Sequence, residues 1–264
     1  MSSMSDGADQ IPSPYRSVEP TAFGDDQAAD LDLPVASEPV DTRVVAVRDV
    51  FKAYSSATGQ LLALDGVSLD VEAGSLHVVA GAAGAGVTTL LGLIACLDRP
   101  DAGQVWVAGV DTVAATREAR RELRRQAIGI VQTHPDANLL PGLAAGGNIA
   151  WAAKRRTGAV LNDSGIEAHL EMVGMAGATR TRVADLSGGE QQRLALACAL
   201  AGDPRLVVVD DPTVTLDRDE ATRFVNALRD AADRGVCVLA GTSDPLVAAV
   251  GDVVTRLHAG KAVP

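Results

Sequence analysis

The sequence predicts an α/β fold with a largely parallel sheet, and two observations carry this prediction. Short runs of apolar residues alternate with longer stretches of helical pattern along most of the 264 residues, the order expected when helices connect parallel strands. A glycine-rich turn, residues 81–89, separates one apolar run from a helical stretch, as in domains that bind phosphate groups at the start of a helix. The chain has enough residues to bury a sizeable core in one domain.

Seven strands and five helices are expected in order along the chain. The strands are short runs rich in valine, isoleucine and leucine, at residues 44–47, 76–80, 104–107, 128–131, 206–209, 236–240 and 253–257. The helices are the stretches at residues 88–97, 117–125, 166–173, 191–201 and 220–234. The early strands, joined by turns such as residues 101–103, are expected to form an antiparallel appendage. Residues from about 134 to 189 predict helices and loops with little strand.

Charge is spread unevenly along the chain. Residues 1–42 hold nine acidic side chains and one arginine, which accounts for −8 of the net charge of −11. This segment is rich in proline, serine and aspartate and has few large apolar residues, so we expect a disordered acidic tail. It lacks the basic and apolar regions of a signal peptide. Residues 43–264 are expected to form one domain of near-neutral charge, which argues against nucleic acid as a partner.

Two further features of composition bear on the setting of the protein. The three cysteines, at positions 96, 198 and 237, are far apart and lack metal-binding spacing, which fits buried thiols in a reducing cytosol. Residues 76–97 form an apolar run long enough to suggest a membrane span. Four glycines and two adjacent threonines within this run favour a strand, a loop and a buried helix instead.

The glycine-rich turn matches the phosphate-binding pattern G-x-x-x-x-G-K-[ST] at every position except the lysine. Backbone N–H groups of such a turn point at phosphate oxygens, and the start of the following helix adds to the attraction. Val87 stands at the lysine position, so the cation that reaches the terminal phosphates is missing. The residues expected to bind nucleotide here are Gly81, Gly84, Ala85, Gly86, Val87, Thr88 and Thr89, with the Thr88 hydroxyl expected to bind Mg²⁺.

A second motif gives the sequence a family resemblance. Residues 186–193 read LSGGEQQR, and the chain from about residue 43 to 261 resembles the nucleotide-binding domains of ATP-binding cassette (ABC) transporters. The resemblance implies a P-loop NTPase with a RecA-like core, an antiparallel β subdomain and an inserted α-helical subdomain at about residues 134–189. The run Asn138-Leu139-Leu140-Pro141 and Asn148 resemble the corresponding stretch of lipoprotein-export and macrolide-efflux cassettes.

The resemblance also assigns roles to residues outside the turn. Asp210 ends an apolar strand, where the family keeps a carboxylate for Mg²⁺. Tyr54 stands where the family keeps an aromatic ring that stacks on adenine, or it is a packing tyrosine at a strand end. In ABC dimers each nucleotide lies between the phosphate-binding turn of one domain and the signature motif of the other. The signature residues expected to contact the partner's nucleotide are Ser187, Gly188, Gly189 and Glu190.

Three more positions depart from the family pattern. Asp211 replaces the glutamate that polarises the attacking water, and it is one methylene shorter; a turn or helix cap is the alternative reading. Ser243 replaces the histidine that contacts the terminal phosphate. Thr133 replaces the glutamine of the Q-loop, and Gln132 lies one residue early, where strand alternation turns it to the other face.

These observations predict an ATP-binding subunit of an ABC transporter, with ATP and Mg²⁺ as cofactors. We expect its own site to hydrolyse ATP slowly or not at all, while its intact signature completes the site of a second cassette with intact motifs. Membrane permease subunits are the other expected partners, which places the chain in the cytoplasm on the inner face of the cell membrane. A regulatory or scaffold subunit without turnover and a slowly hydrolysing homodimer are the alternatives.

Overall fold

The structure is a computed structural model that describes residues 43–56 and 59–263. The acidic tail expected at residues 1–42 lies outside the described residues. A six-stranded sheet has the strand order β10-β9-β3-β8-β7-β6. Its strands are β3 (Leu76–Ala80), β6 (Ile128–Val131), β7 (Leu206–Asp210), β8 (Cys237–Thr242), β9 (Val253–His258) and β10 (Lys261–Val263). All neighbours pair in parallel except β10, which runs antiparallel to β9. The predicted parallel sheet is thus confirmed.

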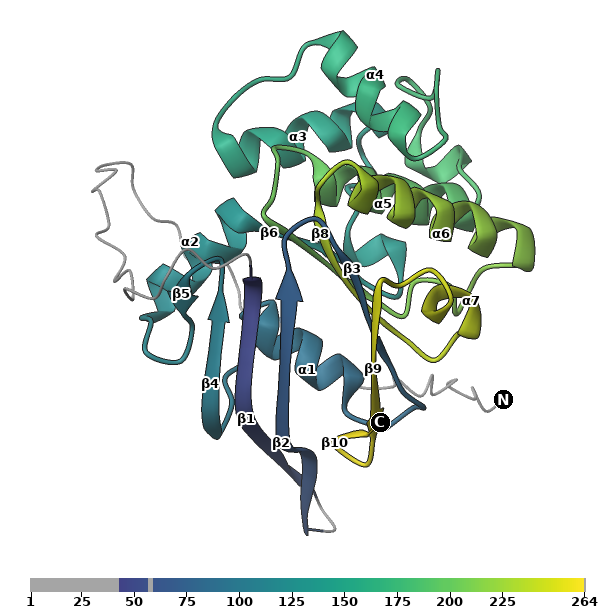
Figure 1. Cartoon of the computed structure of the whole chain (residues 1–264). Coiled ribbons are helices and arrows are strands. Elements are labelled where there is room, and N and C mark those ends of the chain that lie inside the picture. Colours follow the sequence, from purple (N-terminus) through teal and green to yellow (C-terminus); the bar gives the residue numbers. More distant parts are fainter. Residues whose placement is uncertain (1–42, 57–58, 264) are drawn as a thin grey trace, which may run out of the picture. The chain divides into compact units, whose positions relative to one another are not determined.

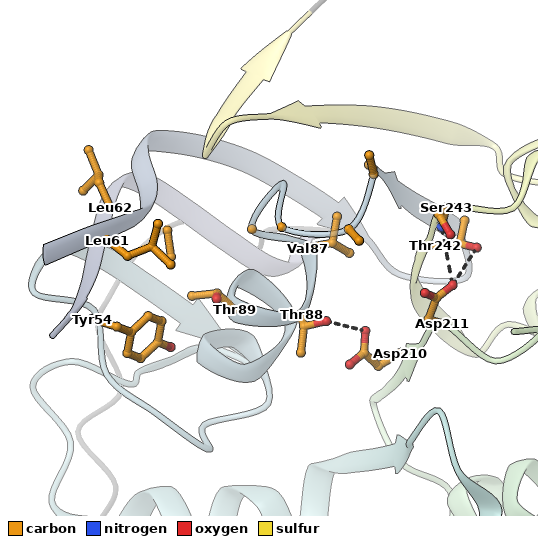
Figure 2. A pocket seen from close by; sticks show the side chains of 16 residues that line it. Tyr54, Leu61, Leu62, Val87, Thr88, Thr89, Asp210, Asp211, Thr242 and Ser243 are labelled. Carbon is orange, nitrogen blue, oxygen red and sulfur yellow. Dashed lines mark hydrogen bonds between the residues drawn. The ribbon is translucent and has the colours of Figure 1, made fainter. Parts of the chain in front are cut away.

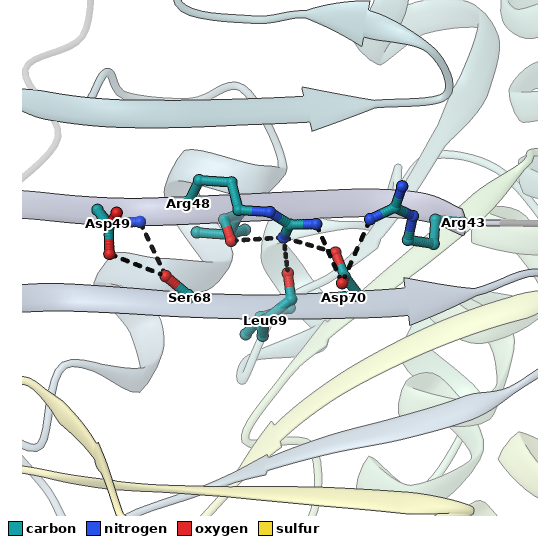
Figure 3. Close-up of polar contacts among 7 residues, drawn as sticks. Arg43, Arg48, Asp49, Ser68, Leu69 and Asp70 are labelled. Atoms are coloured by element: carbon teal, nitrogen blue, oxygen red, sulfur yellow. Dashed lines mark hydrogen bonds and ion pairs between the residues drawn. The ribbon is translucent and has the colours of Figure 1, made fainter. Parts of the chain in front are cut away.

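A four-stranded antiparallel sheet has the order β2-β1-β4-β5. It comprises β1 (Arg43–Ser56), β2 (Gly59–Glu72), β4 (Ala102–Val107) and β5 (Val110–Asp111). Polar contacts link β1 to β2 on one face, where both terminal nitrogens of Arg48 donate to Asp70 at 2.6 and 3.1 Å, and the backbone N–H of Asp49 donates to Ser68 (Figure 3). The pairing of Val47 with Leu69 brings these side chains of β1 and β2 close together.

The antiparallel sheet corrects two sequence expectations. Strand β2 was not predicted, although its second half, residues 67–72, alternates between apolar and polar residues; its first half lacks this alternation and contains Gly66 near its middle. The turn expected at residues 101–103 is also wrong in part, because β4 already begins at Ala102. Gly103 has a φ of 91°, and a Cβ there would overlap the carbonyl oxygen of Asp49, so a glycine lets β4 pass close to β1 at this register shift.

The helices cover the two faces of the six-stranded sheet (Figure 1). They are α1 (Val87–Ile94), α2 (Arg117–Ala127), α3 (Ala145–Thr157), α4 (Asp163–Met172), α5 (Gly188–Leu200), α6 (Arg218–Asp233) and α7 (Pro245–Ala248). Adjacent residues of β3 face opposite cores: Val79 packs with α1 and the antiparallel sheet, and Val78 packs with α5 and α6. The inner strands β3, β7 and β8 are buried on both faces, as apolar strands predict, whereas β9 and β10 at one edge are largely exposed.

The segment between β6 and α5 holds α3, α4 and two short 3-10 helices, Pro135–Ala137 and Val183–Asp185. Helix α3 was not predicted, because Gly146 and Gly147 weaken the helical pattern at its start. A Cβ at Gly146 would lie 2.7 Å from a Thr179 methyl group, so close packing requires a glycine there. The apolar run 76–97 separates into β3, a loop and the eight-residue α1. Among the described residues, no helix has the length and apolar character needed to span a bilayer.

Candidate nucleotide-binding site

The turn between β3 and α1 closes one side of a cavity of about 200 Å³ (Figure 2). Gly84 and Gly86 have φ angles of 80° and 101°, which favour glycine. A Cβ at Gly86 would also overlap the carbonyl oxygen of Ala63. The turn thus needs these two glycines, and it delivers the start of α1 to the cavity. The lining residues are Tyr54, Leu61, Leu62, Ala63, Gly81, Ala82, Ala83, Gly84, Gly86, Val87, Thr88, Thr89, Asp210, Asp211, Thr242 and Ser243.

Among the described residues, the lining contains two carboxylates, those of Asp210 and Asp211, and no lysine, arginine or histidine. Val87, at the lysine position, packs its two methyl groups against Gly81 and Gly241. A Cβ placed on Gly241 would lie 2.6 Å from one Val87 methyl, and a Cβ on Gly81 would lie 2.9 Å from the other. The side chains of the cavity therefore offer a polyphosphate no positive charge, and attraction comes from backbone N–H groups and the start of α1.

Thr88 and Asp210 form the pair expected to bind Mg²⁺. The Thr88 hydroxyl donates to Asp210 at 3.2 Å across the cavity floor (Figure 2). Burial raises the pKa of the Asp210 carboxyl above its ordinary value; the hydrogen bond from Thr88 opposes this, and the charge of Asp211 adds to it. A hydroxyl and a carboxylate fit Mg²⁺, which takes oxygen ligands and usually binds through one or two carboxylates together with substrate phosphates.

The carboxylate of Asp211 is hydrogen-bonded to the end of β8. One of its oxygens accepts from the Thr242 hydroxyl and from the backbone N–H of Ser243, each at 3.4 Å (Figure 2). The backbone of Asp211 has a φ of 43°, and its N–H donates to the carbonyl of Gly241. Asp211 thus lines the cavity and caps the turn at Ser243, which is the alternative reading from the sequence; its role toward an attacking water stays a prediction.

The far end of the cavity is apolar. Tyr54 on β1 lies there with Leu61 and Leu62 on β2, opposite the end that holds Asp211 and Ser243 (Figure 2). The Tyr54 side chain is 40% exposed, and its hydroxyl donates to Asp98 at 3.1 Å. Leu61 and Leu62 were missed by sequence reasoning. Both leucines are exposed on β2, and only the pairing of β2 with β1 brings them to Tyr54.

Two residues predicted from the sequence lie beside the cavity without lining it. Ala85 is buried under the turn. The Thr133 hydroxyl donates to the backbone carbonyl of Asp210 at 3.1 Å, so it supports the end of β7. Gln132 is exposed, and its backbone N–H donates to the side chain of Asn138.

The signature residues lie at the start of α5, outside the cavity. The Ser187 hydroxyl accepts from the N–H of Glu190, and the Glu190 carboxylate accepts from the N–H of Ser187, which forms a capping box. Gly188 is exposed, with no atom within 4 Å of the place where a Cβ would stand. A Cβ at Gly189 would overlap the carboxylate of Glu220, which is paired with Arg193. This leaves Ser187 and Gly188 open to contact from another molecule.

Comparison with known proteins identifies the family. The ABC transporter family matches residues 64–214, more than half of the chain. The chain belongs to the ABC transporter family. Lipoprotein-releasing system ATP-binding protein LolD of Anaeromyxobacter dehalogenans (strain 2CP-C) is 39% identical to this cassette over 232 residues, 86% of the chain and 95% of that protein. Macrolide export ATP-binding/permease protein MacB of Escherichia coli (strain K12) is 31% identical over 226 residues, 84% of the chain but only 34% of MacB.

Solved structures agree with this assignment. The dimeric ATP-binding cassette MJ0796, in a post-hydrolysis state with bound ADP and Pi, superposes with a TM-score of 0.73 at 28% identity. The superposition covers 83% of this chain and 97% of that one. The cassette cbiO1 of Clostridium perfringens has a TM-score of 0.74 at 22% identity, covers 85% of this chain and 88% of its own, and shows the fold alone. The chain is an ATP-binding subunit of the ABC type, and the predicted P-loop NTPase fold is confirmed.

Proposed function

We propose that this cassette binds MgATP in its own cavity without turning it over, while its signature motif completes the active site of a second cassette. The observation that carries the proposal is the charge of the cavity: two carboxylates and no cationic side chain line it. Phosphoryl transfer is catalysed mainly by positioning and by stabilising negative charge, so such a cavity suits binding better than turnover.

Binding is supported by the parts of the site that remain. The glycine-rich turn keeps its left-handed glycines, and Thr88 and Asp210 already contact each other at the expected Mg²⁺ position. Tyr54 lies at the apolar end, where stacking on a base contributes about 1–3 kcal/mol. Loss of the lysine removes a charge-assisted hydrogen bond worth about 1.5–3 kcal/mol, so binding is expected to be weak but measurable.

Three residues at the positions that normally act on the attacking water and the terminal phosphate support the absence of turnover: Asp211, Ser243 and Thr133. Asp211 is one methylene shorter than glutamate, and its carboxylate is hydrogen-bonded to Thr242 and Ser243. Misplacing a catalytic group by about 1 Å costs on the order of 10²-fold in rate. Ser243 supplies a hydroxyl where the family has an imidazole, and Thr133 is engaged with the backbone of Asp210.

The role in a partner's site is supported by the signature motif, which is intact and open. Gly188 and Ser187 present the start of α5 to solvent, where backbone N–H groups attract a phosphate. MJ0796 is a dimer, and MacB carries a permease in its name. We infer partners of the same two kinds for this chain: a second cassette that keeps its lysine and glutamate, and membrane permease subunits that hold the complex at the inner face of the membrane.

The test uses the assembled complex, with the permease and the second cassette co-expressed. Gly188→Asp places a negative charge where the partner's nucleotide must approach, and it meets no atom of this chain. We expect it to abolish ATP hydrolysis by the complex. Val87→Ala, the matched control within the cassette's own cavity, should leave hydrolysis nearly unchanged. Gly189→Asp is a poorer choice, because the new side chain would collide with Glu220.

The outcomes separate the candidate functions. Parental hydrolysis with Gly188→Asp would refute the asymmetric arrangement and leave a regulatory or scaffold subunit as the better description. Hydrolysis by the purified chain alone, lost in Asp210→Asn, would indicate a slowly hydrolysing homodimer instead.

A further inference from the structure

The ring of Tyr54 is supported from one side by Lys52, which lies two residues earlier on β1. The Lys52 ammonium group stands 5.2 Å from the centre of the Tyr54 ring, within the range of a cation–π contact. Only 11% of the Lys52 side chain is exposed, although lysine is rarely buried without a partner. Lys52 does not line the nucleotide cavity, whereas Tyr54 does.

The ammonium group of Lys52 is held by the loop that follows α1. It pairs with Asp98 at 3.0 Å and with Asp101 at 3.5 Å, and it donates to the carbonyl of Arg99 at 2.8 Å. The same Asp98 oxygen accepts the hydroxyl of Tyr54. One carboxylate therefore fixes both the cation beneath the ring and the polar end of the ring.

The protonation states agree with this geometry. Burial lowers the pKa of Lys52, but the hydrogen bond and charge of Asp98, with further help from Asp101, outweigh it and leave the pKa raised. Burial tends to raise the pKa of Asp98, but hydrogen bonds from the Arg99 N–H and from Lys52 leave it lowered. Lys52 is charged and Asp98 is ionised at neutral pH, so the ion pair persists there.

We propose that Lys52 is a positioning residue for nucleobase binding: with Asp98 it holds the Tyr54 ring in place so that the ring stacks on the base. The inference rests on the proposed binding of MgATP in this cavity. The physical reason is entropic. A half-exposed tyrosine on a strand has several rotamers, and a base that stacks on it must otherwise select one of them. Lys52 and Asp98 select the rotamer before the nucleotide arrives.

The test compares a ligand that has a base with one that lacks it. MgATP and magnesium tripolyphosphate share the phosphate groups, and only MgATP stacks on Tyr54. Lys52→Met should weaken MgATP binding about fivefold or more while tripolyphosphate affinity stays within about twofold. Lys52→Arg keeps a cation that pairs with carboxylates and stacks on rings, and it should restore MgATP affinity to within about twofold of the parent. Calorimetric titration measures both ligands.

The matched control is Arg48→Met. Arg48 lies on the same strand and forms an ion pair with Asp70 on the neighbouring strand (Figure 3), whereas Tyr54 has its polar and ring contacts with Asp98 and Lys52. It should leave the ratio of the two affinities unchanged. Should Lys52→Met fail to fold, Asp98→Asn replaces it, because asparagine still accepts the Tyr54 hydroxyl but no longer pairs with Lys52.

Each outcome decides the question. A lower ratio of MgATP to tripolyphosphate affinity in Lys52→Met or Asp98→Asn supports the role, and an unchanged ratio overturns it while leaving the proposed function intact. Equal loss for both ligands also overturns it, since that pattern indicates a general structural effect. Failure of the parent chain to bind MgATP at millimolar concentration overturns the proposed binding and this inference together.

Discussion

Restoring the missing lysine should tighten nucleotide binding without restoring turnover. The Val87 methyl groups pack against Gly81 and Gly241. The side chain introduced by Val87→Lys is longer, so we expect it to extend from this position along the cavity wall. The cavity then gains its only cationic side chain, opposite the carboxylates of Asp210 and Asp211. A charge-assisted hydrogen bond contributes about 1.5–3 kcal/mol, so MgATP should bind about ten- to a hundredfold more tightly.

Turnover should stay near zero in the same variant, because the lysine changes neither Asp211 nor Ser243. The Asp211 carboxylate still accepts hydrogen bonds from Thr242 and Ser243, and no imidazole reaches the terminal phosphate. Binding is measured by calorimetric titration with MgATP, and turnover by steady-state phosphate release at saturating MgATP. Both are measured on the purified chain.

Val87→Met is the matched control, because methionine has nearly the length of lysine and no charge. If Val87→Met tightened binding as much as Val87→Lys, charge would not be the missing element and the electrostatic reasoning would be wrong. If Val87→Lys alone turned over ATP at about 1 s⁻¹, a rate typical of modest enzymes, the inference drawn from Asp211 and Ser243 would be wrong.

Three further predictions follow from the site and the core. The purified parent chain should release phosphate from MgATP far more slowly than about 1 s⁻¹. The Mg²⁺-dependent part of MgATP affinity should fall as the pH drops, because Asp210 takes up a proton and no longer binds Mg²⁺. Since the pKa of Asp210 is raised, this loss should occur at a higher pH than for an exposed aspartate. Titrations with and without Mg²⁺ over a pH series test this, and Asp210→Asn should abolish the pH dependence. Burial raises the pKa of the Cys96 thiol to about 11 and those of Cys198 and Cys237 to about 12, so a thiol reagent in mildly alkaline buffer should label the folded chain slowly and all three thiols after denaturation.

The parallel sheet was predictable because its strands carry their own signal. Predictions for β3 and β6 match the structure at both ends, since each is a short, mostly apolar run that is followed at once by a polar residue or glycine. Strand β2 was missed because its first residues are exposed and its role as a sheet partner depends on β1. Pairing between strands depends on residues far apart in the sequence, so the strand propensity of one segment does not predict it.

The site was predictable where backbone conformation dictates the residue type. Gly84 and Gly86 have left-handed φ angles, and the sequence shows this requirement directly. The contacts of Asp211 were not predictable, because they join β7 to the end of β8 through a hydrogen bond between residues 32 positions apart. Leu61 and Leu62 were not predictable as cavity residues for the same reason, since β2 brings them to Tyr54 only after the antiparallel sheet forms.

The two halves of the nucleotide site differ in how much they depend on side chains. In the half built on β3 and β7, Val87 stands in place of the family's lysine and Ser243 in place of its histidine, and both of those residues act through their side chains. The backbone turn is unaffected by these replacements. In the half built on α5, we expect attraction for phosphate to come from backbone N–H groups and from the Ser187 hydroxyl. A capping box fixes this helix start, and the ion pair between Arg193 and Glu220 braces it against α6. Under the proposed function, side-chain substitutions are therefore expected to remove turnover from the first half while leaving it able to bind, and the second half is expected to stay complete for a partner to use.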